Sequence, residues 1–449
     1  RGPKSKEILK QVLEFESPAH FYFFFFGVPP VLERGKGATV WDADGNEYVD
    51  LIGGASVLNV GISHPRVVEV IKEQCEKLIQ YVEMPHETRM KLAKKMNEIT
   101  PGSHRKKVYY TATGGEAVEA AMKFARYYTG HPGIMSFYGG YHGRTYGAMD
   151  ATMSAYLRYF QGLPLDMGVF HVPYAYCYRC AFGLDYPDCD LRCARYVEEN
   201  FKNPQHGLRV GGHAEGVNNL AAILVEATQC ANGPVIPPPE FIQEIRRIAD
   251  DYGVLLIVDE VQSGWGRTGK LWACEHSGVV PDIMTVAKSI AMGIPLSMTI
   301  ARAEIMDELG TGAHSTTFGG IPLACAAGLA VIEVFEREKL VERSAEMGKY
   351  FLKGFEDLAK EHLLIGNLQG QGLHIGAELV KDRKTKEPAV EENVIVQDES
   401  LKRGVLYLRG GYYGNMIKIM CPLVIQKEQV NKCIETFDVA LSIAERRAK

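Results

Sequence analysis

Short apolar runs alternate with amphipathic helical segments between His64 and Glu333, and this alternation constrains the fold more than any other feature. Continuous apolar runs bounded by turn residues are typical of strands that are buried on both faces. Parallel strands need a crossover between them, so repeated units of this kind predict an α/β fold with a mainly parallel sheet. The strand-like runs are KVYYTAT, GIMSFY, AAILVEA, VLLIVDE and DIMTVAK, and two helical segments are GGEAVEAAMKFARYY and PPEFIQEIRRIADDYG.

The two ends of the chain show a different pattern. Residues 5–15 predict a short amphipathic helix, and GATVWDADGNEYVDL predicts an antiparallel hairpin around the turn signal Asp44-Gly45. After about residue 335 the pattern predicts a helix, a strand around GLHIGAELV, an exposed KDRKTKEP loop, and a final strand and helix. We therefore expect residues 1–64 and 336–449 to form a small α+β domain beside a large domain of residues 65–335.

Charge and hydropathy argue against two classes of partner. The 449 residues include 50 Lys and Arg and 55 Asp and Glu, which gives a net charge of −5 without a basic stripe. Nucleic acid is therefore not expected as a partner. The aromatic-rich run FYFFFFGVPPVL is too short to span a membrane, and the N-terminus has no signal-peptide pattern. We expect a soluble, cytoplasmic protein.

Two of the apolar runs end in charged residues. VLLIVDE ends in Asp259 and Glu260, and DIMTVAK, one βα unit later, ends in Lys288. Open α/β sheets bind ligands at the carboxyl ends of their strands, so a ligand site would explain these charges. A lysine in partly apolar surroundings also becomes a nucleophile for aldehydes. The alternatives are a solvated turn for the carboxylates and a lysine whose amine reaches solvent at the strand end.

A third run, TATGG, places Thr113, Gly114 and Gly115 where a strand leads into a helix. Free backbone amides and the positive end of the helix dipole would make this an anion site, whereas the alternative is an ordinary glycine turn. The pattern is neither GxGxxG nor GxxxxGK[ST], which argues against a Rossmann site and a P-loop. A cofactor with an aldehyde, a pyridine ring and a phosphate would need the lysine, a carboxylate and these amides together.

Several motifs together resemble the class III (subgroup II) pyridoxal 5′-phosphate (PLP) aminotransferases, which include the ornithine and 4-aminobutyrate enzymes. The resemblance extends from about Val40 to Pro422. It implies the PLP-dependent transferase fold of type I and an amino donor with a 2-oxo acid acceptor. It also implies a homodimer, or a dimer-based tetramer, whose active sites are shared between subunits. The motifs are VWDADGNEYVDL, YHGRTYGAM, IVDEVQSGWGRTG, PDIMTVAKSIAMGIPLS and STTFGGIPLACAAGLAV.

The resemblance implies a role for each matched residue. Lys288 would form the internal aldimine with the cofactor and then move the proton of the substrate α-carbon. Asp259 would keep the pyridine nitrogen protonated, Gln262 would bind the phenolic oxygen and Tyr141 would stack on the ring. The other implied cofactor-binding residues are His142, Glu226, Gly114 and Gly115 at the phosphate, and Thr317, which would reach that phosphate from the neighbouring subunit.

The sequence departs from the family pattern at the substrate side. Lys418 stands where the family has an arginine for the substrate α-carboxylate, and Ala231 stands where 2-oxoglutarate enzymes have a gating glutamate. Arg144, which resembles the arginine for a distal carboxylate, is retained, and Gly115 and Ile321 replace a common serine and asparagine. We therefore expect monocarboxylic partners such as pyruvate or glyoxylate and a broad range of donors. An amino-acid racemase or epimerase, or a dialkylglycine decarboxylase-like enzyme, is the alternative within the same fold, and the donor and acceptor stay open.

Three further features lead to separate expectations. Cys177, Cys180, Cys189 and Cys193 have the spacing C-x2-C-x8-C-x3-C, which predicts a structural zinc site, with disulfides or free thiols as alternatives. Glu260 is expected to be structural, with Arg267 as its partner. Tyr22 to Phe26 are expected either to line the substrate entrance or to form an ordinary buried cluster.

Overall fold

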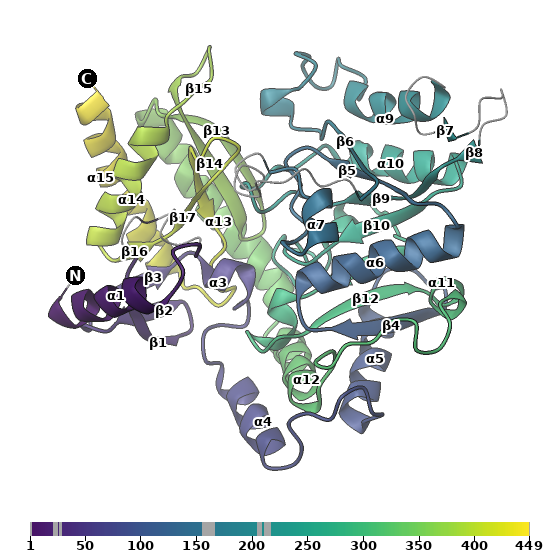
Figure 1. The fold of residues 1–449 in the computed structure, drawn as a ribbon. Helices are drawn as coiled ribbons and strands as arrows, with labels where there is room; N and C mark the ends of the chain where they lie inside the picture. The colour runs from purple at the N-terminus through teal and green to yellow at the C-terminus, as the bar shows by residue number, and fades with distance from the viewer. Residues whose placement is uncertain are drawn as a thin grey trace.

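The computed structural model describes residues 2–20, 26, 29–154, 167–203, 209–210 and 217–448 (Figure 1). Its largest element is a seven-stranded sheet with the order β4-β12-β11-β10-β9-β5-β6. The five predicted strand-like runs all contribute to this sheet, which confirms the α/β fold class. The strands are β4 (Lys106–Thr111), β5 (Gly133–Phe137), β6 (Val169–Val172), β9 (Leu220–Val225), β10 (Leu255–Asp259), β11 (Ile283–Val286) and β12 (Ser297–Arg302).

One strand of this sheet runs against the others. β12 is antiparallel to both β11 and β4, whereas β9, β10 and β11 pair in parallel, as do β5 and β6. The ten residues between β11 and β12 contain only a short 3-10 helix, η4 (Lys288–Ala291). A parallel return needs a longer crossover, so the chain comes back antiparallel. The sheet is therefore mixed and mostly parallel.

Helices cover both faces of the sheet. Along β10, Leu256 and Val258 belong to one buried core and Leu255 and Ile257 to a second core on the other face. This alternation follows from the two-residue period of a strand and explains why the run is apolar throughout. The helices are α4 (Pro65–Cys75), α5 (Glu87–Ile99), α6 (Gly114–Thr129), α7 (Tyr146–Ala151), α9 (Arg192–Lys202), α10 (Pro239–Asp251), α11 (Ala303–Glu308) and α12 (Pro322–Arg337), with η1 (Cys177–Arg179) and η3 (Ala273–His276).

The two chain ends meet in a second lobe, in which the purple N-terminal strands lie beside yellow-green C-terminal elements (Figure 1). The predicted hairpin is present as β2 and β3, and the C-terminal strand β16 pairs in parallel with β3. The strands of this lobe are β1 (Leu32–Lys36), β2 (Thr39–Asp42), β3 (Glu47–Asp50), β13 (Ile365–Gln371), β14 (His374–Asp382), β15 (Glu387–Pro388), β16 (Val405–Leu406), β17 (Leu408–Gly410) and β18 (Met416–Ile419).

The C-terminal strands form an antiparallel sheet with the order β13-β14-β18-β17, and β15 pairs with the end of β14. A short separate pair consists of β7 (Arg209–Val210) and β8 (Val217–Asn218). No described helix is long and apolar enough to cross a membrane. The remaining helices are α1 (Pro3–Phe15), α3 (Gly53–Ser56), α13 (Leu340–Glu361), α14 (Val390–Lys402) and α15 (Lys427–Ala448).

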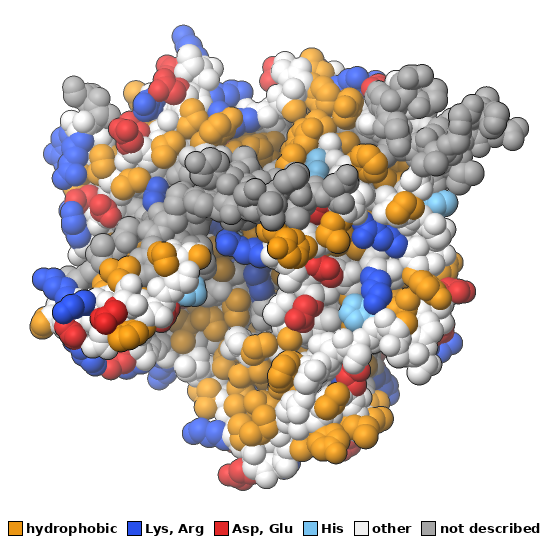
Figure 2. Space-filling view, in the orientation of Figure 1, with side chains coloured by type: hydrophobic (Ala, Val, Ile, Leu, Met, Phe, Trp, Pro, Cys, Tyr) orange, Lys and Arg blue, Asp and Glu red, His pale blue; other side chains and the backbone are white. Residues whose placement is uncertain are grey.

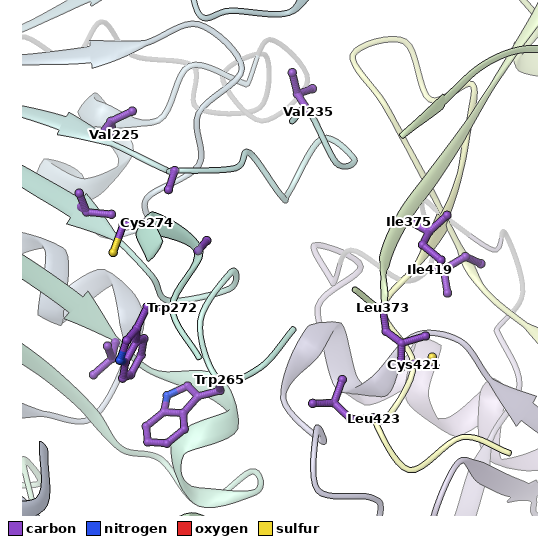
Figure 3. Close-up of a cluster of buried hydrophobic side chains, with 14 of the residues drawn as sticks. Val225, Val235, Trp265, Trp272, Cys274, Leu373, Ile375, Ile419, Cys421 and Leu423 are labelled. Atoms are coloured by element: carbon purple, nitrogen blue, oxygen red, sulfur yellow. The ribbon is translucent and has the colours of Figure 1, made fainter. Parts of the chain in front are cut away.

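A buried arginine ties distant segments of the chain together. Arg267 is 0% exposed and donates hydrogen bonds to the carbonyl oxygens of Leu373 (3.0 Å) and Cys421 (2.6 Å). The same guanidinium binds Ser56 Oγ and Asn59 Oδ1, so it reaches three other regions of the sequence. Figure 3 shows Leu373 and Cys421 on one side of this core and Trp265 on the other.

The expected pair between Glu260 and Arg267 is wrong. The Glu260 carboxylate accepts hydrogen bonds from Ser263 Oγ (2.6 Å) and from the Cys274 amide (2.8 Å). Local donors therefore satisfy this buried carboxylate, and Arg267 serves acceptors from other segments. The spacing of the two residues in the sequence carried no information about this difference.

Replacing Arg267 with methionine should destabilise the fold strongly. The substitution keeps much of the volume but leaves several buried acceptors without donors, each worth about 1–3 kcal/mol. We expect the free energy of unfolding to fall by at least about 3 kcal/mol, measured by chemical denaturation. Arg247→Met is the control, because Arg247 makes exposed ion pairs on α10 that contribute less than about 1 kcal/mol. Equal losses in the two variants would contradict the assigned role of Arg267.

Candidate active site

A cavity of about 570 Å³ lies at the carboxyl ends of β10 and β11. Nearly all of the predicted cofactor residues line it, although they come from segments far apart in the sequence. Thr317 and Lys418 are the predicted cofactor-binding and substrate-binding residues that do not line it. The predicted residues in the cavity wall are Gly114, Gly115, Tyr141, His142, Arg144, Glu226, Asp259, Gln262 and Lys288.

Lys288 is the first residue of η4, and one extended residue, Ala287, separates it from the end of β11. Its φ is +53°, a left-handed conformation that costs energy for a residue other than glycine. Its amine donates a hydrogen bond to Gln262 Oε1 at 3.1 Å. Burial lowers the pKa of Lys288 below its usual value, so a larger fraction of the amine is neutral.

Asp259 is the last residue of β10 and is 3% exposed. Its Oδ1 accepts hydrogen bonds from the Val261 amide and from Thr285 Oγ1, both at 3.0 Å. Its Oδ2 lies 2.7 Å from His142 Nδ1. Burial lowers the pKa of His142, but the hydrogen bond and negative charge of Asp259 outweigh it and raise that pKa overall. Asp259 is therefore a fixed, charge-stabilised acceptor in the wall of the cavity.

The N-terminus of α6 forms another part of the wall. Thr113 caps this helix, and Glu116 Oε2 accepts from the amides of Ala112 (2.8 Å) and Thr113 (3.2 Å). Gly114 and Gly115 follow as the first helical residues, whose amides have no acceptor within a helix. A Cβ at Gly114 would approach Val261 Cγ1 to 2.8 Å, so the close packing here requires glycine. The result is a narrow cradle of backbone amides for an anion.

Glu226 holds two loops of the cavity wall. Its Oε2 accepts from the Tyr141 amide at 3.0 Å, and its Oε1 accepts from the Cys230 amide at 3.2 Å. Burial raises the pKa of Glu226 to about 7. Its contacts orient the backbone at Tyr141 and Cys230, so in this structure it acts on the shape of the wall.

Lys418 lies on β18, close to the cavity but outside its lining. Its side chain is 5% exposed, and its amine donates to the carbonyl oxygen of Ala231 at 3.0 Å. Burial lowers the pKa of Lys418 to about 8, and the nearby charge of Lys288 acts in the same direction. The carbonyl of Ala231 therefore occupies the place of the missing carboxylate as the partner of this cation.

Sequence reasoning missed three residues of this region. Thr285 pairs in register with Asp259 across β10 and β11, and its position inside the apolar run DIMTVAK was a usable signal. Cys230 donates to the Thr228 carbonyl at 3.1 Å and is buried near Lys288 and Lys418. His374 is fully buried on β14, and nothing in the local pattern distinguished it from an ordinary core residue.

The predicted zinc site is not assembled. The described residues contain no group of three or more His, Cys, Asp or Glu side chains that could hold a metal ion, and all described cysteines are free. The physical reason is the position of Cys193 on α9, where its side chain packs against the main hydrophobic core. Burial raises the pKa of Cys193 to about 11.

The aromatic segment lies mostly outside the described residues. Tyr22 to Phe25 are not described, so their predicted place at the substrate entrance stays a prediction. Phe26 packs against the small buried cluster of Val40, Tyr48 and Leu406.

Comparisons with known sequences agree with the geometry of the cavity. The family model described as aminotransferase class-III matches residues 27–441. A leucine/methionine racemase from Thermococcus litoralis is 39% identical over 422 residues, which cover 93% of this chain and 91% of the relative. A probable 4-aminobutyrate aminotransferase from Bacillus subtilis is 36% identical over 410 residues, which cover 91% of this chain and 92% of the relative.

Solved structures give the same result. An aminotransferase from Bacillus anthracis has a TM-score of 0.89 and 31% identity, and the match covers 99% of both chains. An amine transaminase from an uncultivated Pseudomonas species, solved in a PLP-bound form, has a TM-score of 0.86 and 28% identity, covering 96% of this chain and 98% of that one. The chain therefore belongs to the class III aminotransferases, PLP-dependent enzymes with the type I fold.

Proposed function

We propose that this enzyme transfers an amino group from an amino acid or ω-amino acid to a 2-oxo acid, with Lys288 and Asp259 as its catalytic residues. One observation carries the proposal. The amine of Lys288, the carboxylate of Asp259 and the N-terminus of α6 all face a single cavity at the carboxyl end of the sheet. A nucleophile, an acceptor for a protonated ring nitrogen and an anion cradle are the three features that PLP requires of a protein.

The residues present fit the cofactor. Gly114 and Gly115 would bind its phosphate through backbone amides, in the cradle where a side chain at Gly114 has no room. Tyr141 would cover one ring face, and Gln262, which already accepts from Lys288, would reach the phenolic oxygen. Bound PLP supplies an electron sink for the electrons left when a bond at the substrate α-carbon breaks.

Lys288 would move the proton at the substrate α-carbon. A proton carrier must be uncharged for part of the time at neutral pH, and the lowered pKa of Lys288 provides that condition. The left-handed backbone at Lys288 directs its side chain from the strand end into the cavity. Strain of this kind persists only when the surrounding structure enforces it, which supports a functional position.

Asp259 would hold the proton on the ring nitrogen. A carboxylate in a buried site stabilises a positive partner more strongly than one in water. Thr285 and the Val261 amide bind one oxygen of Asp259 and His142 lies against the other. These contacts fix the direction of the carboxylate before a ligand arrives, so no reorganisation is needed during the reaction.

Lys418 and Arg144 are the proposed substrate-binding residues. Lys418 would attract the α-carboxylate, since it carries the one buried cation on β18 that approaches Lys288. Arg144 is exposed at the cavity mouth, where it would meet a distal carboxylate. Because the partner of Lys418 is a backbone carbonyl, the cation is held weakly and stays available to monocarboxylic substrates.

Racemisation or epimerisation of one amino acid is the second candidate function. The contact between Lys418 and the Ala231 carbonyl favours it, because no carboxylate gate adapts the site to two different substrates. A relative with 39% identity is named a leucine/methionine racemase. The two functions use the same lysine and cofactor and differ in the atom that receives the proton.

The homodimer with a shared site is also a proposal. Thr317 does not line the cavity of its own chain, so its predicted phosphate contact requires a second subunit. Its carbonyl accepts from Gln80 Nε2 at 2.9 Å, and the neighbouring Phe318 is 61% exposed. Large exposed apolar patches mark interfaces, and Figure 2 shows such side chains over the region of α4, α5 and α12. Further exposed apolar residues beside Gln80 are Leu78, Ile79, Tyr81, Val82 and Met84. A cytoplasmic location stays a prediction.

An absorption spectrum with single amino acids tests the function. Transamination predicts that a donor without acceptor converts the bound cofactor to its amine form, while racemisation predicts loss of enantiomeric purity without that conversion. Lys288→Ala should lose both reactions and the borohydride-trapped cofactor, because the nucleophilic amine is gone. A Lys288→Ala enzyme with wild-type activity would exclude both functions as proposed.

Asp259→Asn should separate cofactor binding from catalysis. The amide keeps the shape of the side chain but removes the charge, so PLP should remain bound while the turnover falls by about a hundredfold or more. Single-turnover kinetics with the cofactor-loaded variant measure this directly. Thr285→Val is the matched control, because it removes one hydrogen bond to Asp259 and leaves the charge. A turnover of Asp259→Asn close to that of the wild-type enzyme would show that this carboxylate has another role.

The pKa of Lys418 predicts a pH effect on carboxylate binding. Only the ammonium form attracts a carboxylate, and its pKa of about 8 lies below the usual lysine value. Isovalerate is a monocarboxylate without an amino group, so it can bind but cannot react. Its inhibition constant should therefore be constant below that pH and rise about tenfold per pH unit above it. Lys418→Arg should abolish this alkaline limb, because a guanidinium stays charged. If Lys418→Arg shows the same loss of isovalerate affinity at alkaline pH, a group other than Lys418 causes it.

A further inference from the structure

One face of the C-terminal sheet is polar and meets the large lobe. Gln369 Oε1 accepts from the Ile236 amide at 2.7 Å, and the side chains of Gln371 and Thr228 lie 3.0 Å apart. Lys418 reaches the Ala231 carbonyl from the same sheet. The segment 228–236 of the large lobe thus provides partners for the polar side chains of β13 and β18.

His374 is on this face but has no partner. His374 is 0% exposed, and neither of its ring nitrogens makes a hydrogen bond. Burial lowers the pKa of His374 well below its usual value, and the charges of Lys418, Arg267 and Lys288 add to the effect. The ring is therefore neutral and has one N–H donor and one acceptor nitrogen to offer. A buried polar group of this kind costs about 1–3 kcal/mol when it is left unpaired.

The sheet register places His374 next to Lys418. Ile375 pairs with Ile419, and Figure 3 shows these two side chains together in the hydrophobic core. Strand residues alternate between faces, so His374 and Lys418 both lie on the opposite face, as diagonal neighbours of β14 and β18. Gly376 is the direct partner of Lys418, and Met416 and Pro234 pack where a side chain at this position would lie. Lys418 has three donors, and the Ala231 carbonyl takes one of them.

We propose that His374 donates a hydrogen bond to the substrate carboxylate and, together with Lys418, completes a two-point carboxylate subsite. The proposal rests on the proposed function, because it assumes a substrate with a carboxylate near Lys288. A lysine is a point charge without the two-pronged geometry of an arginine. A neutral imidazole N–H adds a second, directed donor without placing another positive charge beside Lys288 and Lys418.

Binding of a simple carboxylate tests His374 without turnover. Isovalerate and its uncharged analogue isovaleramide are titrated into the PLP-loaded enzyme by calorimetry. His374→Met fills the space of the ring but provides no hydrogen-bond donor. It should lower the affinity for isovalerate about tenfold, the loss expected for one hydrogen bond to a charged group. It should leave isovaleramide nearly unchanged. His374→Gln, which restores an N–H donor, should recover most of the isovalerate affinity.

Asn367→Ala is the matched control. Asn367 is on β13 opposite Glu378, farther along the same sheet, and its side-chain amide nitrogen also lacks a partner. It should leave isovalerate binding unchanged. Equal isovalerate affinity in wild type and His374→Met, or equal losses in His374→Met and Asn367→Ala, would overturn the proposal.

Imidazole chemical shifts provide a measurement that does not depend on a variant folding. With ¹⁵N-labelled histidine, the His374 resonance should shift on addition of isovalerate but not of isovaleramide, and an unchanged resonance would overturn the proposal. Failure of the proposed function is recognised separately. An enzyme that binds isovalerate through His374 yet neither transaminates nor racemises amino acids would contradict the function and leave the subsite intact.

Discussion

The buried carboxylate of Asp259 is the constraint on which the rest of the site depends. A charge at the end of an apolar strand is tolerated only where donors surround it. Thr285 from the next strand, the Val261 amide and His142 supply those contacts. The parallel pairing of β10 with β11 brings Thr285 into register and places Lys288 just beyond the same sheet edge. The position of one carboxylate therefore fixes the geometry of the lysine, the histidine and the cavity between them.

The site also depends on how the two lobes meet. Nearly all of the residues that line the cavity belong to the large lobe, whereas Lys418 and His374 are on strands of the C-terminal sheet. Arg267 holds the loop after β10 against Leu373, the residue just before β14, and against Cys421, just after β18. A buried cation with four acceptors in three separate segments leaves little freedom for that contact. The placement of Lys418 near Lys288 follows from packing at a distance from the chemistry.

The sequence predicted the parts of this arrangement that are local or periodic. Apolar runs gave the strands, and the spacing of one βα unit brought Asp259 and Lys288 to one edge of the sheet. Properties set by distant segments could not be predicted in this way. The Ala231 carbonyl opposite Lys418 and the unpartnered His374 both depend on contacts between segments far apart. The zinc site predicted from the cysteine spacing was not found for the same reason, because the spacing does not show that Cys193 packs against the main hydrophobic core.

The weak partner of Lys418 has a consequence for specificity. A glutamate in place of Ala231 would hold a buried cation by a charge-assisted bond, and each substrate carboxylate would have to displace it. A backbone carbonyl carries no net charge, so its hydrogen bond to Lys418 lacks the ion-pair attraction of a carboxylate and is given up at less cost. The site then makes no distinction between a first and a second carboxylate ligand. Such a pocket suits two monocarboxylic substrates in turn, or one amino acid in both configurations, and selection between substrates must come from the side-chain end of the cavity.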